Sequence, residues 1–311
     1  MLIMYRRYLE ILKSYIFGDT ESTDDSKETK NEVEESQRCE NTELKSETIP
    51  DEVRAKWESE QQRLKTNVID SDADVVKEIR QSSGQPGKGD MRQFYLGGVD
   101  ISFVKGDNVN ACAALVVVSF PSLEVVYEDY EMIKLTAPYV SGFLAFREVD
   151  FIVALYRKVQ KNDPEHTPDI ILVDGNGILH HRQFGLACHL GVLLDIPCIG
   201  VAKKLCQVDG LEKDADHTTK IKELKKGGDM FQLIGDSGRC LGMTLRSHDT
   251  STNPIYVSTG HRISLDSATW LVHQCCRYRV PEPVRLADVN SREYLRNNFK
   301  PDKLADPADD V

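Results

Sequence analysis

The feature that most constrains the fold is a strand–helix–strand pattern between residues 170 and 202. Ile170–Val173 is a short, continuous apolar run, which is typical of a strand covered on both faces. Phe184–Leu194 has helical spacing, and Pro197–Ala202 is a second buried strand. Because this order implies a parallel crossover, the pattern predicts an α/β protein.

The preceding segment adds an antiparallel part. Three β-rich runs with short connections, Tyr95–Phe103, Ala111–Ser119 and Glu124–Lys134, predict a meander. Arg147–Gln160 is predicted to be a helix with an apolar stripe, which consists of Val149, Ile152, Val153 and Tyr156. The order βββ–α–β–α–β predicts one domain with a mixed sheet.

Further elements flank this region. Asp51–Leu64 is predicted to be a helix with Trp57 and Leu64 on its buried side, and Gln81–Asp90 a loop. Three later runs are predicted to be strands: Met230–Ile234, Arg239–Leu245 and Ile255–Ser258. A last helix is expected to begin at the N-cap Ser264 and to bury Ala268, Leu271, Val272 and Cys275.

Charge divides the 311 residues into three regions. Residues 18–49 hold 11 acidic and 4 basic residues with few large apolar groups, so residues 1–49 are predicted to be a mostly disordered, acidic extension. Residues 301–311 form an acidic tail. The domain at 50–300 carries only −3 of the net charge of −11, so a substrate of either sign remains open.

Composition excludes some classes of protein. The longest apolar runs fall short of the roughly 18–20 residues of a membrane span, so no membrane association is expected. Met1–Phe17 has helical spacing, and a surface helix or a disordered start is favoured over an organelle presequence. The 8 cysteines are scattered, which favours a reducing compartment, and the adjacent Cys275 and Cys276 are interpreted as core thiols.

Three acidic residues stand at informative places. Asp100 lies within a strand on the face opposite Val99, Ile101 and Phe103. Asp174 directly follows Ile170–Val173, at the carboxyl end of a buried strand, where ligands gather in α/β sheets. Glu148 lies in the first turn of its helix, at the edge of the apolar stripe. Each alone has an ordinary structural explanation, but the predicted topology makes their elements neighbours.

Converging carboxylates indicate a metal-dependent reaction. Oxygen ligands without a His/Cys cage suit Mg²⁺ or Mn²⁺ acting on a phosphate ester. ATPases also use such an arrangement, but the sequence contains no G-x-x-x-x-G-K-[ST] motif.

Several segments together resemble the endonuclease V family. They are GGVDISF at 97–103, APYVSGFLAFRE at 137–148, VDGNG at 173–177, HHRQFGLACHLGVLLDIPCIGVAK at 180–203 and STGHR at 258–262. The resemblance covers roughly 50–300 in order. It implies an RNase H-like fold and a metal-dependent phosphodiesterase that recognises inosine and cuts the second phosphodiester 3′ to it, leaving 3′-hydroxyl and 5′-phosphate ends.

The resemblance also assigns roles to residues. Asp100 and Asp174 would hold the metal, Mg²⁺ with Mn²⁺ able to substitute, and Glu148 would complete the site through water or as general base. Lys203 would stabilise phosphate charge. His261, in what the sequence suggests is a loop before a helix, would be a catalytic or phosphate-contacting residue. Asp266 is expected to stabilise the N-terminus of that helix; the alternative is that it lies close to the metal.

The resemblance further implies a substrate-binding surface. Tyr139, in Pro138-Tyr139-Val140-Ser141, matches the family's wedge, an aromatic side chain that replaces a base leaving the stack. Ser141 departs from the bacterial Pro-Tyr-Ile-Pro. Pro-Tyr-Val-Ser resembles eukaryotic members, which as a group resemble ribonucleases acting on inosine in RNA, and this weakens a claim of duplex-DNA repair. The base pocket would be formed by Gly142, Leu144, Gly175, His180, Leu186, Gly200 and Ala202.

The expected partner is therefore inosine-containing single-stranded RNA, bound by a monomer in the cytoplasm or nucleus, including the nucleolus. Two rivals remain: a DNA-repair endonuclease acting on deoxyinosine, and a catalytically silent inosine-RNA binder. Basic clusters at 203–204, 220–226 and 277–279 are candidates for phosphate contacts, although surface lysines are usually just solvated.

Overall fold

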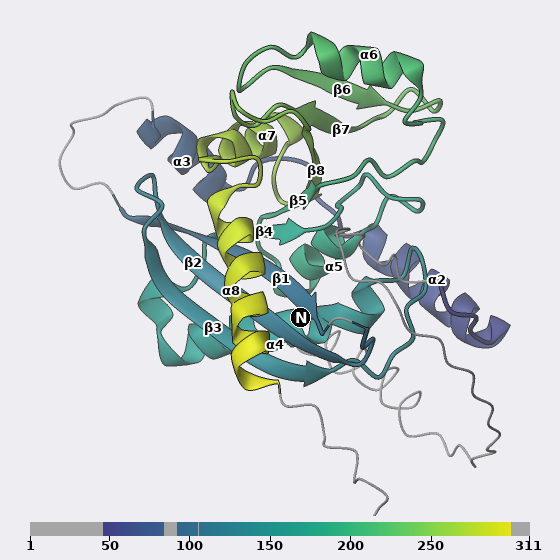
Figure 1. The fold of residues 1–311 in the computed structure, drawn as a ribbon, viewed down its shortest axis with the longest axis vertical. Coiled ribbons are helices and arrows are strands. Elements are labelled where there is room, and N and C mark those ends of the chain that lie inside the picture. Colours follow the sequence, from purple (N-terminus) through teal and green to yellow (C-terminus); the bar gives the residue numbers. More distant parts are fainter. Residues whose placement is uncertain (1–45, 84–91, 105, 300–311) are drawn as a thin grey trace, which may run out of the picture.

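One eight-stranded mixed sheet organises the protein (Figure 1). The structure is a computed structural model that describes residues 46–83, 92–104 and 106–299. The strand order is β3-β2-β1-β4-β5-β8-β7-β6. The strands are β1 (Phe94–Phe103), β2 (Asn110–Phe120), β3 (Val125–Lys134), β4 (Ile170–Asp174), β5 (Cys198–Ala202), β6 (Met230–Ile234), β7 (Cys240–Leu245) and β8 (Ile255–His261). A single α/β domain with a mixed sheet flanked by helices is thus confirmed.

The strand pairings agree with both predicted topological units. β1, β2 and β3 form an antiparallel meander, and β4 pairs in parallel with β1 and with β5. Since β1, β4 and β5 run in the same direction, their carboxyl ends meet at one edge of the sheet. Asp100, Asp174 and Lys203 lie toward this edge, where side chains from different strands can meet around one ligand.

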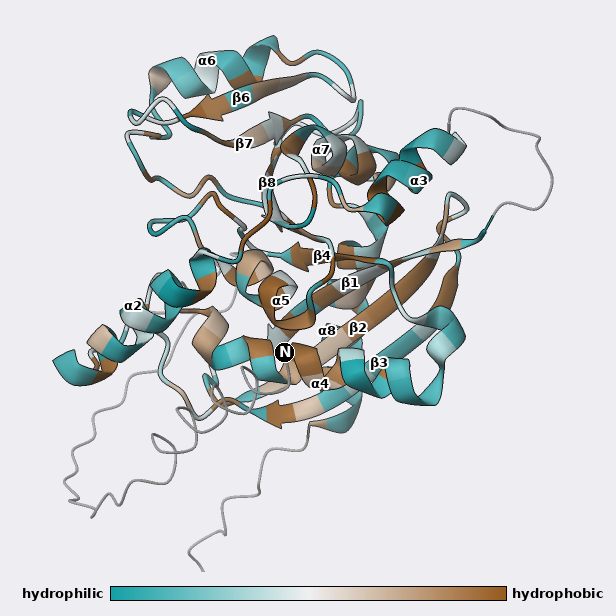
Figure 2. Ribbon diagram, turned by 180° about the vertical axis from the view of Figure 1, so that it is seen from behind, coloured by the Kyte–Doolittle hydropathy of each residue, from teal (hydrophilic) through white to brown (hydrophobic). Residues whose placement is uncertain are grey.

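Helices cover both faces of the sheet, as Figures 1 and 2 show from opposite sides. On one face, Trp57 of α2 and the apolar stripe of α4 pack with Val99, Leu115 and residues of α5. The other face carries α3, α7 and α8. The helices are α2 (Asp51–Lys65), α3 (Asp74–Ser83), α4 (Ala145–Asn162), α5 (Leu186–Leu194), α6 (Ala215–Glu223), α7 (Leu265–Gln274) and α8 (Glu282–Asn298), with a short 3₁₀ turn η1 (Pro164–His166).

Four helices were predicted and three were not. α2, α4, α5 and α7 match the sequence patterns, and Ser264 caps α7 by accepting a hydrogen bond from the Ser267 amide. α3, α6 and α8 were missed, and the expectation that α7 is the last helix is wrong because α8 follows it. Strand β8 also extends further than predicted. His261 is consequently the last residue of a strand and does not lie in a loop.

The predictions for the termini are only partly within the described residues. Those for Met1–Phe17, for most of 18–49 and for 301–311 lie outside them. Residues 46–49 differ from the predicted disorder: Ile49 is buried in the core beside α2 and α4, and Glu47 is hydrogen-bonded to Tyr139. Across the described ranges, every helix is too short or too polar to cross a membrane.

Candidate active site

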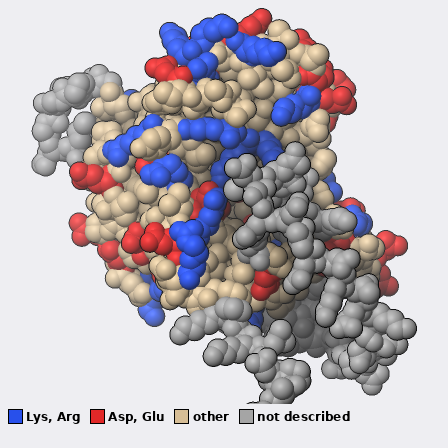
Figure 3. Space-filling view, viewed as in Figure 1, with Lys and Arg blue, Asp and Glu red and all other residues tan. Residues whose placement is uncertain are grey.

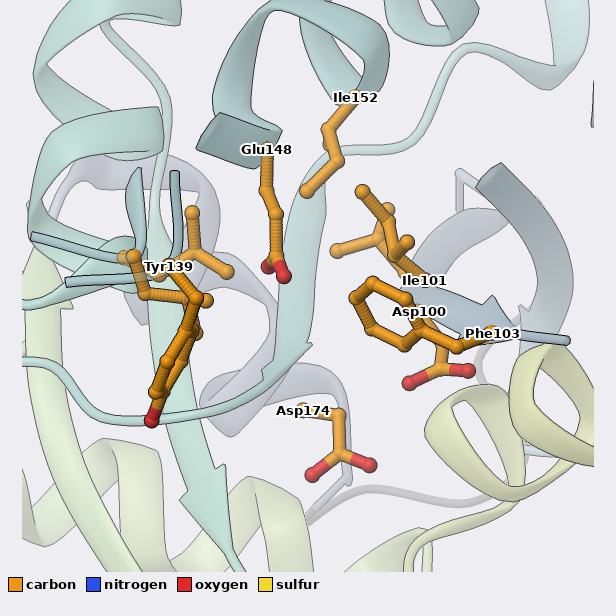
Figure 4. A pocket seen from close by; sticks show the side chains of 10 residues that line it. Asp100, Ile101, Phe103, Tyr139, Glu148, Ile152 and Asp174 are labelled. Carbon is orange, nitrogen blue, oxygen red and sulfur yellow. The ribbon is translucent and has the colours of Figure 1, made fainter. Parts of the chain in front are cut away.

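Asp100, Glu148 and Asp174 line one cavity of ≈ 230 Å³. Figure 4 shows the three side chains around one space with Tyr139 at its side; the Glu148 carboxylate points into this space and the Asp174 carboxylate points away from Glu148. Apolar side chains complete the wall, namely Val99, Ile101, Phe103, Leu144, Ile152 and Leu186. The structure therefore brings the three predicted acidic residues together, although they come from β1, α4 and β4.

Local structure explains why each of these residues lines the cavity. Asp100 belongs to β1, and Asp174 ends the neighbouring parallel strand β4, where Val99 pairs with Val173. Glu148 lies in the first turn of α4, and Leu144, Glu148 and Ile152 follow one another on the side of this segment that lines the cavity. The partial positive charge of a helix N-terminus favours a carboxylate there.

Burial and mutual repulsion act on these groups. Burial, followed by the charges of Asp174 and Asp288, raises the pKa of Asp100 well above its usual range. Burial, together with the charge of Asp100, raises the pKa of Glu148 to about 8. Because ionising these buried, mutually repelling carboxylates is unfavourable, a bound cation that neutralises their charge would stabilise the site.

A fourth acidic residue, Asp288 of α8, belongs to the same cluster and was missed by the sequence analysis. The Lys203 ammonium bridges Asp174 Oδ2 at 2.6 Å and Asp288 Oδ2 at 3.1 Å. Burial alone would lower the pKa of Lys203, but the two carboxylates raise it. The available signal was an Asp on the buried face of a helix, four residues after Val284 and seven before Leu295.

The donor set fits a hard divalent cation. Asp100, Asp174 and Asp288 offer carboxylate oxygens only, and the Lys203 ammonium already occupies a cationic position between two of them. As they stand in the described part of the chain, no three His, Cys, Asp or Glu side chains converge tightly enough to enclose an ion. Arg292 also pairs with Asp288 Oδ1, so a cation would compete with Lys203 and Arg292 for the Asp288 carboxylate.

Tyr139 lies at the cavity wall on a loop whose backbone is held by the chain preceding α2. The Glu47 amide donates to Tyr139 O at 2.7 Å, and the Tyr139 amide donates to Glu47 Oε1 at 3.1 Å. The Ser46 hydroxyl accepts the Ser141 amide at 3.1 Å. These contacts fix the position of the loop while the Tyr139 ring remains partly exposed.

The next residues of the predicted base pocket are fixed by an arginine clamp. Gly142 has φ +81°, a conformation that favours glycine, and its carbonyl accepts hydrogen bonds from Arg182 Nη2 at 2.7 Å and Gln61 Nε2 at 3.0 Å. The Arg182 guanidinium also lies 4.0 Å from the centre of the Phe143 ring. His180 lies beside them, and burial lowers its pKa to about 4, so its imidazole is neutral at pH 7.

Only some residues of the predicted base pocket border the cavity. Leu144 and Leu186 line it, and Gly175 lies against Leu186. At Gly200 a Cβ would come within 2.4 Å of the Gly177 amide nitrogen, so the chain needs glycine there for close backbone packing. Ala202 instead packs with Leu179 and Tyr256 in a separate apolar cluster.

The structure does not bring His261 to the acidic cluster. His261 pairs with Cys198 at the beginning of β5, whereas Lys203 follows its end, a separation of roughly 16 Å at about 3.3 Å per residue. The imidazole is buried between the Ile69 amide and the Asp195 carboxylate. Asp266 lies in the first turn of α7, where an acidic residue is expected to stabilise the helix N-terminus, and it forms an ion pair with Arg80 of α3.

Positive charge gathers on the face that α8 crosses. Figure 3 shows Lys and Arg side chains in a band over this face and again over α6. Arg285, Arg292 and Arg296 belong to α8, and Lys220 and Lys222 to α6. The two adjacent cysteines are free thiols, as expected: Cys275 is buried and Cys276 is partly buried.

Comparison with known proteins identifies the family. The sequence profile described as Endonuclease V matches residues 77–289. This chain belongs to the endonuclease V family. Endonuclease V of Mus musculus is 58% identical over 254 residues, which are 82% of this chain and 73% of that protein. Membership identifies the protein as a hydrolytic nuclease.

Solved endonuclease V structures share the fold. The catalytic domain of human endonuclease V superimposes with a TM-score of 0.76 at 55% identity, covering 80% of this chain and 98% of that one. Endonuclease V of Ciona intestinalis superimposes with a TM-score of 0.71 at 34% identity, covering 80% of this chain and 99% of that one. That structure is a complex with a 23mer DNA containing an inosine followed by a ribo-adenosine.

Proposed function

We propose that this endonuclease V cleaves inosine-containing single-stranded RNA at the second phosphodiester bond 3′ to inosine, leaving 3′-hydroxyl and 5′-phosphate ends. The observation that carries the proposal is the cavity in which Asp100, Glu148 and Asp174 meet beside Tyr139. The cation would be Mg²⁺, with Mn²⁺ able to substitute, and the protein would act as a monomer in the cytoplasm or nucleus.

Each residue has a defined task in this reaction. Asp100 and Asp174, joined by Asp288, would hold the cation, which when bound neutralises phosphate charge and activates water. Glu148, with a pKa of about 8, is suited to accept a proton near neutral pH. Lys203 lies within reach of Asp174 and Asp288 and would stabilise charge on the phosphate.

The substrate side rests on Tyr139 and the loops around it. The Tyr139 ring would stack where the inosine leaves its neighbours. The backbone at Gly175, which lies against the cavity-lining Leu186, and the loop at Gly142 would read the edge of the flipped base. Hypoxanthine presents an oxo group and N1–H, where adenine presents an amino group and a bare N1, so peptide groups can distinguish them.

The second candidate is cleavage of deoxyinosine in DNA. It is favoured by the Ciona relative, which binds a DNA strand in which a ribo-adenosine follows the inosine. The same strand also contains a ribonucleotide next to the inosine, so it fits a requirement for a 2′-hydroxyl at that position. A catalytically silent binder is disfavoured because the acidic residues are all present.

The test uses four single strands of one sequence: RNA with inosine, RNA with adenosine, DNA with deoxyinosine, and that DNA with one ribonucleotide directly 3′ to deoxyinosine. Products are mapped with Mg²⁺, with Mn²⁺ and with a chelator, using Asp174→Asn as the inactive control. The proposal expects metal-dependent cleavage of the inosine RNA at the second phosphodiester. Equal cleavage of the all-DNA strand would favour the second candidate, and binding without products under either metal would favour the silent binder.

A further inference from the structure

Two buried serine hydroxyls surround one oxygen of Asp100. The Ser102 hydroxyl donates to Asp100 Oδ2 at 2.9 Å, and Ser291 Oγ lies 3.4 Å from the same oxygen. The two hydroxyl oxygens are 2.7 Å apart. Ser102 is 6% exposed and Ser291 is 0% exposed, so water does not replace these contacts.

The proton inventory limits how these groups can bond, because each hydroxyl has one proton to donate. Ser102 donates to Asp100 Oδ2, while Ser291 has three acceptors within reach: Asp100 Oδ2, the Ser102 hydroxyl and the Asp288 carbonyl. The contact between the two hydroxyls therefore couples both serines to the same carboxylate oxygen.

The group joins the elements that carry two of the acidic residues. Asp100 and Ser102 are two residues apart on β1 and therefore share a face of the sheet. Ser291 is three residues after Asp288 on α8, and its Oγ also lies 3.0 Å from the Asp288 carbonyl. The serines thus connect the strand of Asp100 to the helix turn of Asp288.

We propose that Ser102 and Ser291 are positioning residues that fix the Asp100 carboxylate for the divalent cation. By holding Oδ2, they would fix the orientation of the Asp100 carboxylate that holds the ion, and they link β1 to the helix turn of Asp288. This inference rests on the proposed metal-dependent function. Outer hydrogen-bond partners of metal ligands typically contribute 10–100-fold to metal affinity.

The test measures Mn²⁺ binding to the full chain by calorimetry, without nucleic acid. Ser102→Ala and Ser291→Ala should each raise the Kd for Mn²⁺ about 10-fold. The metal concentration for half-maximal cleavage should rise by a similar factor, while kcat at saturating metal stays close to that of the unmodified protein. Because the two hydroxyls contact each other and the same carboxylate oxygen, the double variant should lose less affinity than the sum of the two single losses predicts.

Ser267 offers a matched control. It is 1% exposed, and its hydroxyl donates to a carboxylate, Asp72 Oδ2, at 2.6 Å in the segment leading into α7, away from the cavity. Ser267→Ala should lower the melting temperature without changing the Kd for Mn²⁺. Ser102→Thr, which keeps the hydroxyl on a strand, should retain the affinity of the unmodified protein.

The outcomes separate the two proposals. If the unmodified chain binds Mn²⁺ and both alanine variants bind equally well while losing as much thermal stability as Ser267→Ala, the serines only support packing and the positioning role is wrong. If the unmodified chain shows neither Mn²⁺ binding nor metal-dependent cleavage, the proposed function fails and the positioning role falls with it.

Discussion

At the scale of single residues, the site holds carboxylates that its own cations do not fully compensate. The Lys203 ammonium is bonded to Asp174 and Asp288. Asp100 and Glu148 are left with raised pKa values because both are buried near other negative charges. In the metal-free protein this arrangement lowers stability, which is a common cost of a prepared functional site.

Glu148→Gln tests whether the buried Glu148 carboxylate lowers the stability of the metal-free protein. An acid whose pKa is about 4.5 when unfolded and about 8 when folded lowers the free energy of unfolding as pH rises between these values, by at most about 1.4 kcal/mol per pH unit. Glutamine does not ionise, so the variant does not lose free energy of unfolding as pH rises. It should be more stable than the unmodified protein at pH 8 without metal and similar to it at pH 4.5. Cleavage should fall about 100-fold or more, the usual effect of losing a general base.

Urea unfolding at several pH values, with chelator present, measures this effect. Asp150→Asn is a useful comparison, since burial raises the pKa of Asp150 to about 6 on the same helix without placing it at the cavity. The gain in the free energy of unfolding from Asp150→Asn should be smaller than that from Glu148→Gln, and it should reach its full size near pH 6 instead of pH 8. A Glu148→Gln protein that is less stable than the unmodified protein at pH 8 would contradict the assignment of a raised pKa.

Tyr139→Ala tests the wedge. Loss of one base–aromatic stack should weaken binding of inosine RNA by about 1–3 kcal/mol, as measured by fluorescence anisotropy with Ca²⁺ or a chelator to prevent cleavage. Tyr139→Phe keeps the ring and should bind nearly as well as the unmodified protein. Equal affinity of Tyr139→Ala and the unmodified protein would mean that the ring only packs against its loop.

At the scale of secondary-structure elements, the docking of α8 on β1 determines whether the acidic cluster forms. Gly98 lies two residues before Asp100, and α8 begins directly against it. A Cβ on Gly98 would lie 2.0 Å from the Pro283 carbonyl carbon and 2.6 Å from the Val284 nitrogen. Backbone atoms cannot rotate out of the way as side chains do, so this glycine permits the close approach.

Gly98→Ala should therefore displace α8 together with Asp288 and Ser291. We expect a loss of about 3 kcal/mol in the free energy of unfolding, the upper range for overpacking, and a weakened thermal response to Mn²⁺. Gly97→Ala is the neighbouring control, because its Cβ would meet the Pro168 side chain at 3.1 Å. If both variants retained the metal response of the unmodified protein, α8 would not be needed to assemble the site.

The same helix shows where sequence reasoning stopped. β4, α5 and β5 could be predicted because strands buried on both faces are continuous apolar runs. The buried stripe of α8 is weak by comparison, since its positions are Val284, Ala287, Ser291 and Leu295 in an otherwise charged segment. Asp100, Glu148 and Asp174 could be predicted from their places on strands and a helix start, whereas Asp288 had only its spacing on a weak helical stripe as a signal, and its contact with Lys203 is tertiary.

His261 shows a different limit of sequence reasoning. Its motif suggested a site role, but the extension of β8 places its side chain at the far end of β5, between Ile69 and Asp195. Strand ends are set by pairing with neighbours, here with Cys198, and such pairing is not visible along one segment. The position of a residue in a motif therefore did not fix which end of the sheet it occupies.

At the scale of the whole molecule, net charge and local charge differ in sign. The chain carries −11, yet Lys and Arg gather on the face crossed by α8 (Figure 3). A polyanion approaching this face would meet a basic band, and a cation bound in the acidic cavity would reduce the repulsion between its carboxylates and a phosphate. Metal binding is thus expected to couple to the stability of the whole domain and to pH.

That coupling is directly measurable as thermal stability. Carboxylates must be ionised to bind a divalent cation, and burial together with the charges of Asp174 and Asp288 raises the pKa of Asp100 to about 7, so this ligand is ionised at pH 8 and largely protonated at pH 5.5. Stabilisation by bound metal follows RT ln(1 + [L]/Kd), about 2.7 kcal/mol when the metal is at 100 times Kd. Mn²⁺ should therefore raise the melting temperature strongly at pH 8 and little at pH 5.5. Asp174→Asn should remove most of the increase at pH 8, and an equal increase at both pH values, or one that survives this substitution, would show that the ion binds somewhere other than the carboxylate cavity.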